Sequence, residues 1–213
     1  DASGTEPPEE DELGPPDVPA RSGAGAAGGA APRLADLPPA ERRAERRRRD
    51  GRIPEGTLLV VGGQRDLPDD DLHRRRIRRR LAELISGYAQ MHPDLRVLSG
   101  LRPGGEALGA AAALDAGADW LAVLPWPEPQ RHLRPDDRRR FDELLAAAPG
   151  SLLLEKKTPA DRPARAKALT RRDAWLAGAA DLALVVWDGD EGTTDALVRR
   201  FEGTVGDDVT TVW

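Results

Sequence analysis

Glycine, threonine and carboxylate residues stand close together in the segment WDGDEGTTDALVRR, residues 187–200. Glycine lets a ligand approach the backbone closely, and the amides at the start of a helix attract phosphate. This turn predicts a ligand-binding site that contains Asp188, Gly189, Gly192, Thr193 and Thr194. Carboxylates also catalyse reactions and hold magnesium. We favour solvated turn residues over a metal site for the local acids, which are Asp188, Asp190, Glu191 and Asp195.

Three further turns carry residues suited to binding a nucleotide. The first offers two glycines and two donors, Gly62, Gly63, Gln64 and Arg65. The second precedes an alanine-rich helix and contains Ser99, Gly100, Gly104, Gly105 and Glu106. The third holds a flat ring on which a base can stack, in the pair Pro125 and Trp126. Taken singly, each of the first two turns is better explained by tight strand-to-helix geometry, and local packing explains the third equally well. Four such turns at one edge of a sheet favour a shared ligand site.

Strand and helix patterns alternate from residue 57 onward and would position these turns. Apolar runs predict strands at 57–63, 95–100, 118–124, 151–155, 181–187 and 208–213. Helical spacing predicts helices at 70–90, 105–117, 135–150, 163–179 and 193–203. This alternation indicates an α/β fold, a Rossmann-like, doubly wound and mostly parallel sheet covered by helices on both faces. Ligands of such sheets bind at the carboxyl ends of the strands.

The first fifty residues have a different composition. An acidic, proline-rich stretch, a run of small residues and the basic block AERRAERRRRD follow one another. None of these segments has enough apolar residues to offset the entropy of ordering the chain. We therefore predict a disordered linker over residues 1–50 and a domain over residues 56–213. The arginines at 46–49 and 74–80 are interpreted as solvated runs in preference to a nucleic-acid patch.

Composition narrows the function classes further. The chain has 213 residues, no cysteine and a formal net charge of −5, which argues against disulfides, thiolate metal sites and bulk affinity for nucleic acid. Apolar runs are too short to span a membrane, and no signal-peptide pattern opens the chain, so we expect a cytoplasmic protein. Histidines 73, 92 and 132 are scattered, which argues against zinc. The sequence also lacks the order of residues that acyl transfer requires.

The order of the motifs resembles the SLOG superfamily, a Rossmann-like group that includes DprA and the LOG phosphoribohydrolases. GGQRDL, residues 62–67, resembles the family's opening G-H-R-D-L. Residues 98–127 resemble its S-x-L-A-x-G-A-D segment, aliphatic helix and V-L-P-x-P. Residues 171–195 resemble its closing segment, in which an arginine precedes a strand and a G-G-T turn. The resemblance covers residues 58–213, which is the whole part of the chain that we expect to fold.

Departures from the family pattern bear on catalysis. LOG hydrolases carry P-G-G-x-G-T-x-x-E, and the position of that glutamate is occupied here by Ala196. Asp195 lies one residue early and would point about 100° away on a helix. Gln64 replaces the family's histidine, whereas Arg172 matches its arginine and Glu106 retains an acid. The resemblance thus implies a ligand-binding domain in which hydrolase chemistry has been lost, with no catalytic residue assigned.

The turns predict a domain that binds a nucleotide or a nucleotide-derived small molecule, and the family resemblance implies a sensor, one module of a bacterial signalling or anti-phage conflict protein. Glycines would cradle phosphate and ribose, Arg65 and Arg172 would pair with charge, Glu106 would accept ribose hydroxyls and Trp126 would stack on a base. No other cofactor is assigned. A fused effector, a partner protein or a second copy of the chain are the further partners expected. The alternatives are a nucleotide N-glycosidase that uses Glu106 or Asp195, and a degenerate oligomerisation scaffold.

Overall fold

A single parallel sheet forms the centre of the fold. A computed structural model describes residues 37–68, 70–190 and 192–213. Within these ranges six strands lie in the order β4-β3-β2-β1-β5-β6, and all neighbouring strands are parallel. The strands are β1 (Thr57–Gly63), β2 (Leu95–Ser99), β3 (Trp120–Leu124), β4 (Ser151–Leu153), β5 (Leu182–Val186) and β6 (Val209–Val212). The predicted strands are confirmed, and the central ones are apolar because helices cover them on both faces.

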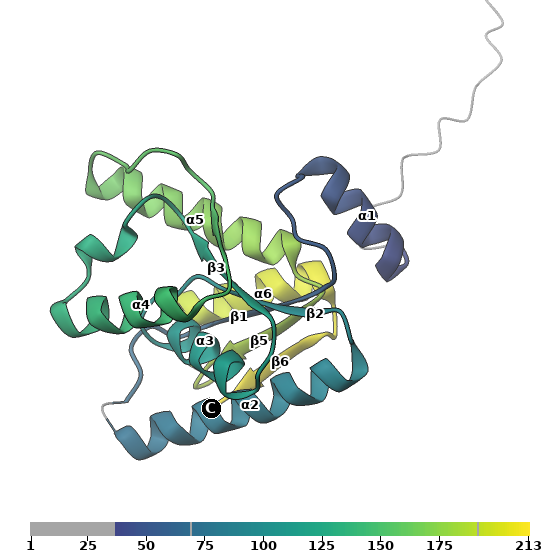
Figure 1. Ribbon diagram of the computed structural model, residues 1–213, viewed down its shortest axis with the longest axis horizontal. Coiled ribbons are helices and arrows are strands. Elements are labelled where there is room, and N and C mark those ends of the chain that lie inside the picture. Colours follow the sequence, from purple (N-terminus) through teal and green to yellow (C-terminus); the bar gives the residue numbers. More distant parts are fainter. Residues whose placement is uncertain (1–36, 69, 191) are drawn as a thin grey trace, which may run out of the picture. The chain divides into compact units, whose positions relative to one another are not determined.

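Helices form a layer on each face of the sheet (Figure 1). They are α1 (Pro39–Arg49), α2 (Asp71–Met91), α3 (Gly105–Asp115), α4 (Pro135–Ala147), α5 (Arg162–Ala179) and α6 (Thr193–Val205), with a short 3-10 helix η2 (Pro129–His132). On one face, Ile77 of α2 and Phe141 of α4 join a core that includes α3. On the other face, Leu176 of α5 and Phe201 of α6 form a second core. The predicted Rossmann-like, doubly wound architecture is therefore confirmed.

The chain reverses its direction across the sheet at β1. It passes from β1 to β4 on one side and then crosses back to place β5 and β6 on the other side. The connection after β1 leads to α2 on one face, and the connection after β5 leads to α6 on the opposite face. Adjacent parallel strands whose connections diverge in this way leave a crevice at their carboxyl ends. The topology thus places a ligand crevice between the turns that follow β1 and β5.

The structure differs from the expected linker over Pro39–Arg49, which forms α1 and belongs to the same compact unit as the sheet. Alanine, glutamate and arginine all favour helices, and proline is tolerated in the first helical turn. Glu45 adds ion pairs to Arg48 and Arg49 along the helix. The prediction of disorder was wrong here because it rested on the lack of apolar residues. Residues 1–36 of the expected linker lie outside the described residues.

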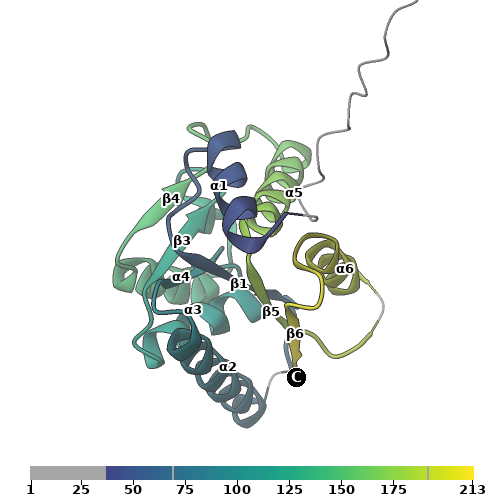
Figure 2. The same cartoon turned by 90° about the vertical axis from the view of Figure 1, so that its right-hand side faces the viewer.

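A buried arginine attaches α1 to the domain. Arg46 is 3% exposed, and its Nη1 donates to the carbonyl oxygens of Ala179 at 3.1 Å and Ala180 at 2.5 Å, where α5 ends. The same nitrogen lies 3.2 Å from a carboxylate oxygen of Asp181, whose other oxygen accepts from the backbone N–H of Leu58 at 3.0 Å. A cation is favourable at the carboxyl end of a helix. Both views show α1 close to that end of α5 (Figures 1 and 2).

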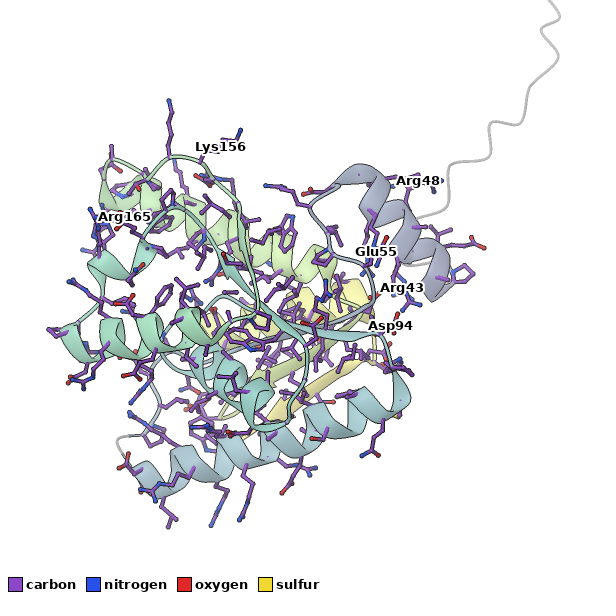
Figure 3. The ribbon with its side chains drawn as sticks, in the orientation of Figure 1. Arg43, Arg48, Glu55, Asp94, Lys156 and Arg165 are labelled. Atoms are coloured by element: carbon purple, nitrogen blue, oxygen red, sulfur yellow. The ribbon has the colours of Figure 1, made fainter. Side chains whose placement is uncertain are left out.

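We expect Arg46→Ala to lower the free energy of unfolding by about 2–3 kcal/mol, because hydrogen bonds from a charged donor are lost and Asp181 loses its buried partner. Urea unfolding curves measure the effect. Arg48→Ala is the matched control, since the Arg48 side chain is 73% exposed and points away from the sheet (Figure 3). The control should change stability by no more than about 0.5 kcal/mol. Equal effects of the two substitutions would contradict the assigned role of Arg46.

Candidate functional site

A crevice of about 540 Å³ opens at the carboxyl ends of β1 and β5, where the topology predicts it. The turn after β1 forms one wall with Gly63, Gln64, Arg65 and Asp66. The turn after β5 and the start of α6 form the opposite wall with Asp188, Asp190, Gly192, Thr193, Thr194 and Leu197. Arg102 and Asp173 complete the lining. Predicted residues from two of the four turns thus meet at one site, and Arg102 adds a residue of a third turn, the one between β2 and α3.

The start of α6 has the features of an anion site. Gly192 caps the helix with a φ of 150°, and no side chain caps the first amides. Gly189 has a φ of 90°, and a Cβ atom at either glycine would have no neighbour within 4 Å. These two glycines are therefore required by backbone conformation and face open space. Uncapped amides together with the helix dipole favour an anionic group at this end of the crevice.

The glycines of the other two glycine-bearing turns serve packing within the domain. A Cβ atom at Gly104 would lie 2.1 Å from the carbonyl oxygen of Gln64, and one at Gly63 would lie 2.4 Å from the carbonyl oxygen of Val186. Gly105 donates its N–H to Gln64 at 2.8 Å, and Gly62 approaches a side chain of α6. The start of α3 is consequently covered by the turn that follows β1. Packing explains these glycines without a ligand.

Glu106 and Arg172, to which the sequence assigned separate ligand contacts, are bonded to each other. Arg172 donates from Nη2 to Oε1 of Glu106 at 2.8 Å and from Nη1 to Oε2 at 3.1 Å. Both residues are buried, at 3% and 1% exposure. Arg102 adds bonds to the same carboxylate from its backbone N–H and from Nε, each at 3.1 Å. Asp173 accepts from the other side of the Arg172 guanidinium at 2.6 Å.

This network holds the loop between β2 and α3. Burial by itself would raise the pKa of the Glu106 carboxyl, but the charges of Arg172 and Arg102 outweigh burial and lower that pKa. Gly100 leaves the space that the pair needs, since a Cβ atom there would lie 2.3 Å from both side chains. The Ser99 hydroxyl donates to the backbone of Glu106 at 2.9 Å, and Leu101 takes a left-handed φ of 62°. The network positions the loop, and Arg102, which belongs to both, places a positive charge in the lining of the crevice.

Trp126 lies apart from the crevice. It is 3% exposed and lines a second cavity of about 260 Å³, together with Pro125 and Phe141. Its indole Nε1 is buried and has no hydrogen-bond partner in the part of the chain that the structure describes. The tryptophan thus serves both as a core residue and as part of a cavity wall. The predicted residues therefore do not share one cavity: some line the crevice, some line the second cavity, and Gly62, Ser99, Gly104, Gly105, Glu106 and Gly189 line neither.

Charges of both signs line the crevice. Asp188 accepts from Gln64 Nε2 at 2.7 Å, and this hydrogen bond lowers the pKa of Asp188. Asp173 is already paired with Arg172, so two of the carboxylates have partners inside the protein. Arg65 is exposed at the mouth of the crevice, and Arg102 lies on its inner wall. Sequence reasoning missed Arg102 and Asp173, although each adjoins a residue of the Glu106–Arg172 pair in the chain or in space.

Comparisons with known proteins bear on the fold. No family model matches this sequence, and no curated protein matches it. DNA processing protein A (DprA) from Streptococcus pneumoniae matches 75% of this chain and 51% of its own, with 19% identity and a TM-score of 0.50. The chain has a DprA-like fold. It spans about half the length of that protein, and the fold implied by the SLOG resemblance is confirmed. The single-stranded-DNA-binding DprA from Helicobacter pylori matches with 15% identity, a TM-score of 0.47 and coverage of 76% and 67%.

The acids of this DprA-like domain do not form a metal centre in the described ranges, where no three histidine, aspartate or glutamate residues gather in a way that could hold an ion. Asp195 pairs with Arg199 one turn further along α6, at 2.8 Å. Glu191 lies outside the described residues. No helix between residues 37 and 213, as described, is long and apolar enough to cross a membrane.

Proposed function

We propose that the crevice binds a nucleotide or a nucleotide-derived small molecule. The observation that carries this proposal is the position of the 540 Å³ crevice at the reversal point of the sheet, with the uncapped start of α6 on its wall. Arg65 and Arg102 line the same crevice and supply charge for an anionic group. Its carboxylates are suited to accepting bonds from sugar hydroxyls. The crevice thus offers positive charge to the phosphate of a nucleotide and hydrogen-bond acceptors to its sugar.

In this proposal the protein recognises its ligand and does not convert it. Ala196 stands where the LOG resemblance places a glutamate, and Glu106 is held by two arginines. A ligand that reports on metabolism or signalling would suit a sensor module, in the cytoplasm, whose output passes through a fused effector, a partner protein or a second copy of the chain. The sensor role and the surrounding conflict or signalling system belong to this proposal.

A second candidate function rests on arginines beside the crevice. Arg65 after β1, Arg74 of α2, and Arg134 and Arg140 at the start and in the first half of α4 line a neighbouring cavity of about 270 Å³. Clustered guanidinium groups are suited to a phosphate backbone. The similarity in fold to DNA processing protein A makes DNA the polyanion to test. This candidate departs from the expectation, drawn from net charge, that nucleic acid is disfavoured.

The test is a thermal-shift panel of nucleotides, cyclic nucleotides and a short single-stranded oligonucleotide. A ligand at a hundredfold excess over its Kd stabilises the fold by about 2.7 kcal/mol. Thr194→Glu places a negative charge at the start of α6, which favours the helix and repels an anion, so we expect loss of nucleotide binding from a stable protein.

Arg140→Ala separates the two candidates, because Arg140 lines the neighbouring cavity and is not part of the crevice lining. This substitution should leave nucleotide binding unchanged and weaken oligonucleotide binding only if the second candidate holds. A panel in which no nucleotide stabilises the protein, or in which Thr194→Glu binds as tightly as wild type, would overturn the first proposal.

A further inference from the structure

Two arginines line both the crevice and the second cavity. Arg65 and Arg102 are shared by the two linings, and each comes from a loop at the carboxyl edge of the sheet. The Glu106–Arg172 network lies between the two cavities: Gly100 and Arg172 line the second cavity, and Asp173 lines the crevice. The two cavities are therefore neighbours across a cationic boundary and not separate sites.

The second cavity differs from the crevice in its chemistry. Its walls include the aromatic rings of Trp126 and Phe141, and among the described residues no aspartate or glutamate lines it. Arg162 and Arg165, near the start of α5, line it together with the two shared arginines. Arg165 is labelled in Figure 3 at the opposite end of the domain from Asp94, which lies next to the amino end of β2. Aromatic walls with guanidinium groups are suited to a planar ring that carries phosphate.

Size limits what each cavity can hold. The second cavity, at about 260 Å³, is smaller than the roughly 300 Å³ at the lower end for pockets that enclose a whole small molecule. It is suited to one ring system whose substituents continue outward past Arg65 and Arg102. The crevice, at about 540 Å³, has room for the next unit and carries the carboxylates that accept from sugar hydroxyls.

We propose that the ligand is a two-part nucleotide, a nucleoside diphosphate joined through its phosphates to a second sugar or nucleoside. This inference rests on the proposed function and deepens it. The ring lies in the second cavity against Trp126, the two phosphates pass between Arg65 and Arg102 into the crevice whose wall includes the start of α6, and the second sugar lies among the carboxylates of that crevice.

Isothermal titration calorimetry with two probes, ADP-ribose and ribose 5-phosphate, tests the inference on the full chain. Wild type should bind ADP-ribose at least about tenfold more tightly, because a stacked ring adds binding free energy. Ala166→Trp fills the second cavity and should lower ADP-ribose affinity about tenfold or more while leaving ribose 5-phosphate unchanged. Ala174→Trp is the matched control on α5, since Ala174 is exposed and lines neither cavity.

A second variant covers the case in which Ala166→Trp fails to fold. Arg162→Glu replaces an exposed residue of the second cavity in the first turn of α5, where a negative charge favours the helix. It should produce the same selective loss for ADP-ribose. If ADP-ribose binds and neither variant weakens it, or if it binds no more tightly than ribose 5-phosphate, the two-part ligand is wrong while the crevice proposal stands. If neither probe binds wild type, and the wider nucleotide panel is also negative, both proposals are wrong.

Discussion

Arg172→Met is expected to lower the free energy of unfolding by about 3–5 kcal/mol, which is the usual cost of removing one partner from a buried ion pair. The substitution leaves the Glu106 carboxylate buried, with Arg102 as its remaining cationic partner. Urea unfolding at neutral pH measures the loss. Arg171→Met is the matched control, because the neighbouring Arg171 side chain is 60% exposed and pairs with Glu155 at the surface. The control should cost no more than about 1 kcal/mol.

Two further measurements separate a lost charge pair from lost packing. Adding Glu106→Leu to Arg172→Met should recover part of the stability, because buried pairs can be replaced by apolar residues at little cost. The pKa of Glu106 is lowered in the folded protein, so the pair stabilises the fold above the unfolded pKa, which is about 4.3, and its contribution is lost as pH falls through the folded pKa. The difference between wild type and Arg172→Met should therefore narrow in acid. A difference that is independent of pH would contradict the charge-pair explanation.

Gly104→Ala is expected to destabilise the domain by about 3 kcal/mol, the combined cost of a left-handed backbone and an overpacked contact. Gly104 has a φ of 94°, and the new Cβ would lie 2.1 Å from a backbone oxygen of Gln64 and 2.5 Å from one of Arg65. Backbone atoms cannot rotate away as a flexible side chain can. Thermal unfolding, together with nucleotide titration of the folded fraction, measures the effect.

Gly117→Ala isolates the contribution of the clash. Gly117 also has a positive φ, of 62°, but a Cβ atom there would have no neighbour within 4 Å. We expect this control to cost about 1–2 kcal/mol, which is the conformational part alone. Equal losses of stability from the two substitutions would contradict the packing explanation of Gly104. If, in addition, only Gly104→Ala abolishes nucleotide binding, Gly104 contacts the ligand, as the sequence predicted for this turn.

The layers of the fold could be predicted because their signals are local. Continuous apolar runs such as Leu58–Val61 and Leu182–Val186 identify buried parallel strands, and helical spacing between them implies crossover helices. The alternation then implies the edge at which a ligand binds. Gly192, Thr193 and Thr194 line the crevice at that edge, and their place in the chain a few residues after an apolar strand is the signal that pointed to it.

Contacts between distant residues could not be predicted from the same signals. Glu106 and Arg172 are 66 residues apart, and their side chains are equally compatible with binding a ligand or binding each other until the fold brings them together. The attachment of α1 could not be predicted for the same reason, because the partners of Arg46 lie 133 to 135 positions further along the chain. Residue type indicated that these groups needed charged or polar partners, and only the three-dimensional arrangement identified them.

The loop that separates the two cavities is short, and buried side chains hold it in place. Residues 100–104 are positioned by the Glu106–Arg172 pair, which bonds to the backbone of Gly100 and Arg102. Of this pair, Arg172 lines the second cavity and Glu106 lines neither cavity. Pro103 lines the second cavity, and its substitution leaves the bonds of Glu106 to Arg102 and Arg172 in place. Arg102 belongs both to that network and to the linings of the two cavities, so its substitution changes the ligand groups and the support of the loop together. Ligand preference and loop stability are therefore coupled at Arg102 and separable at Pro103.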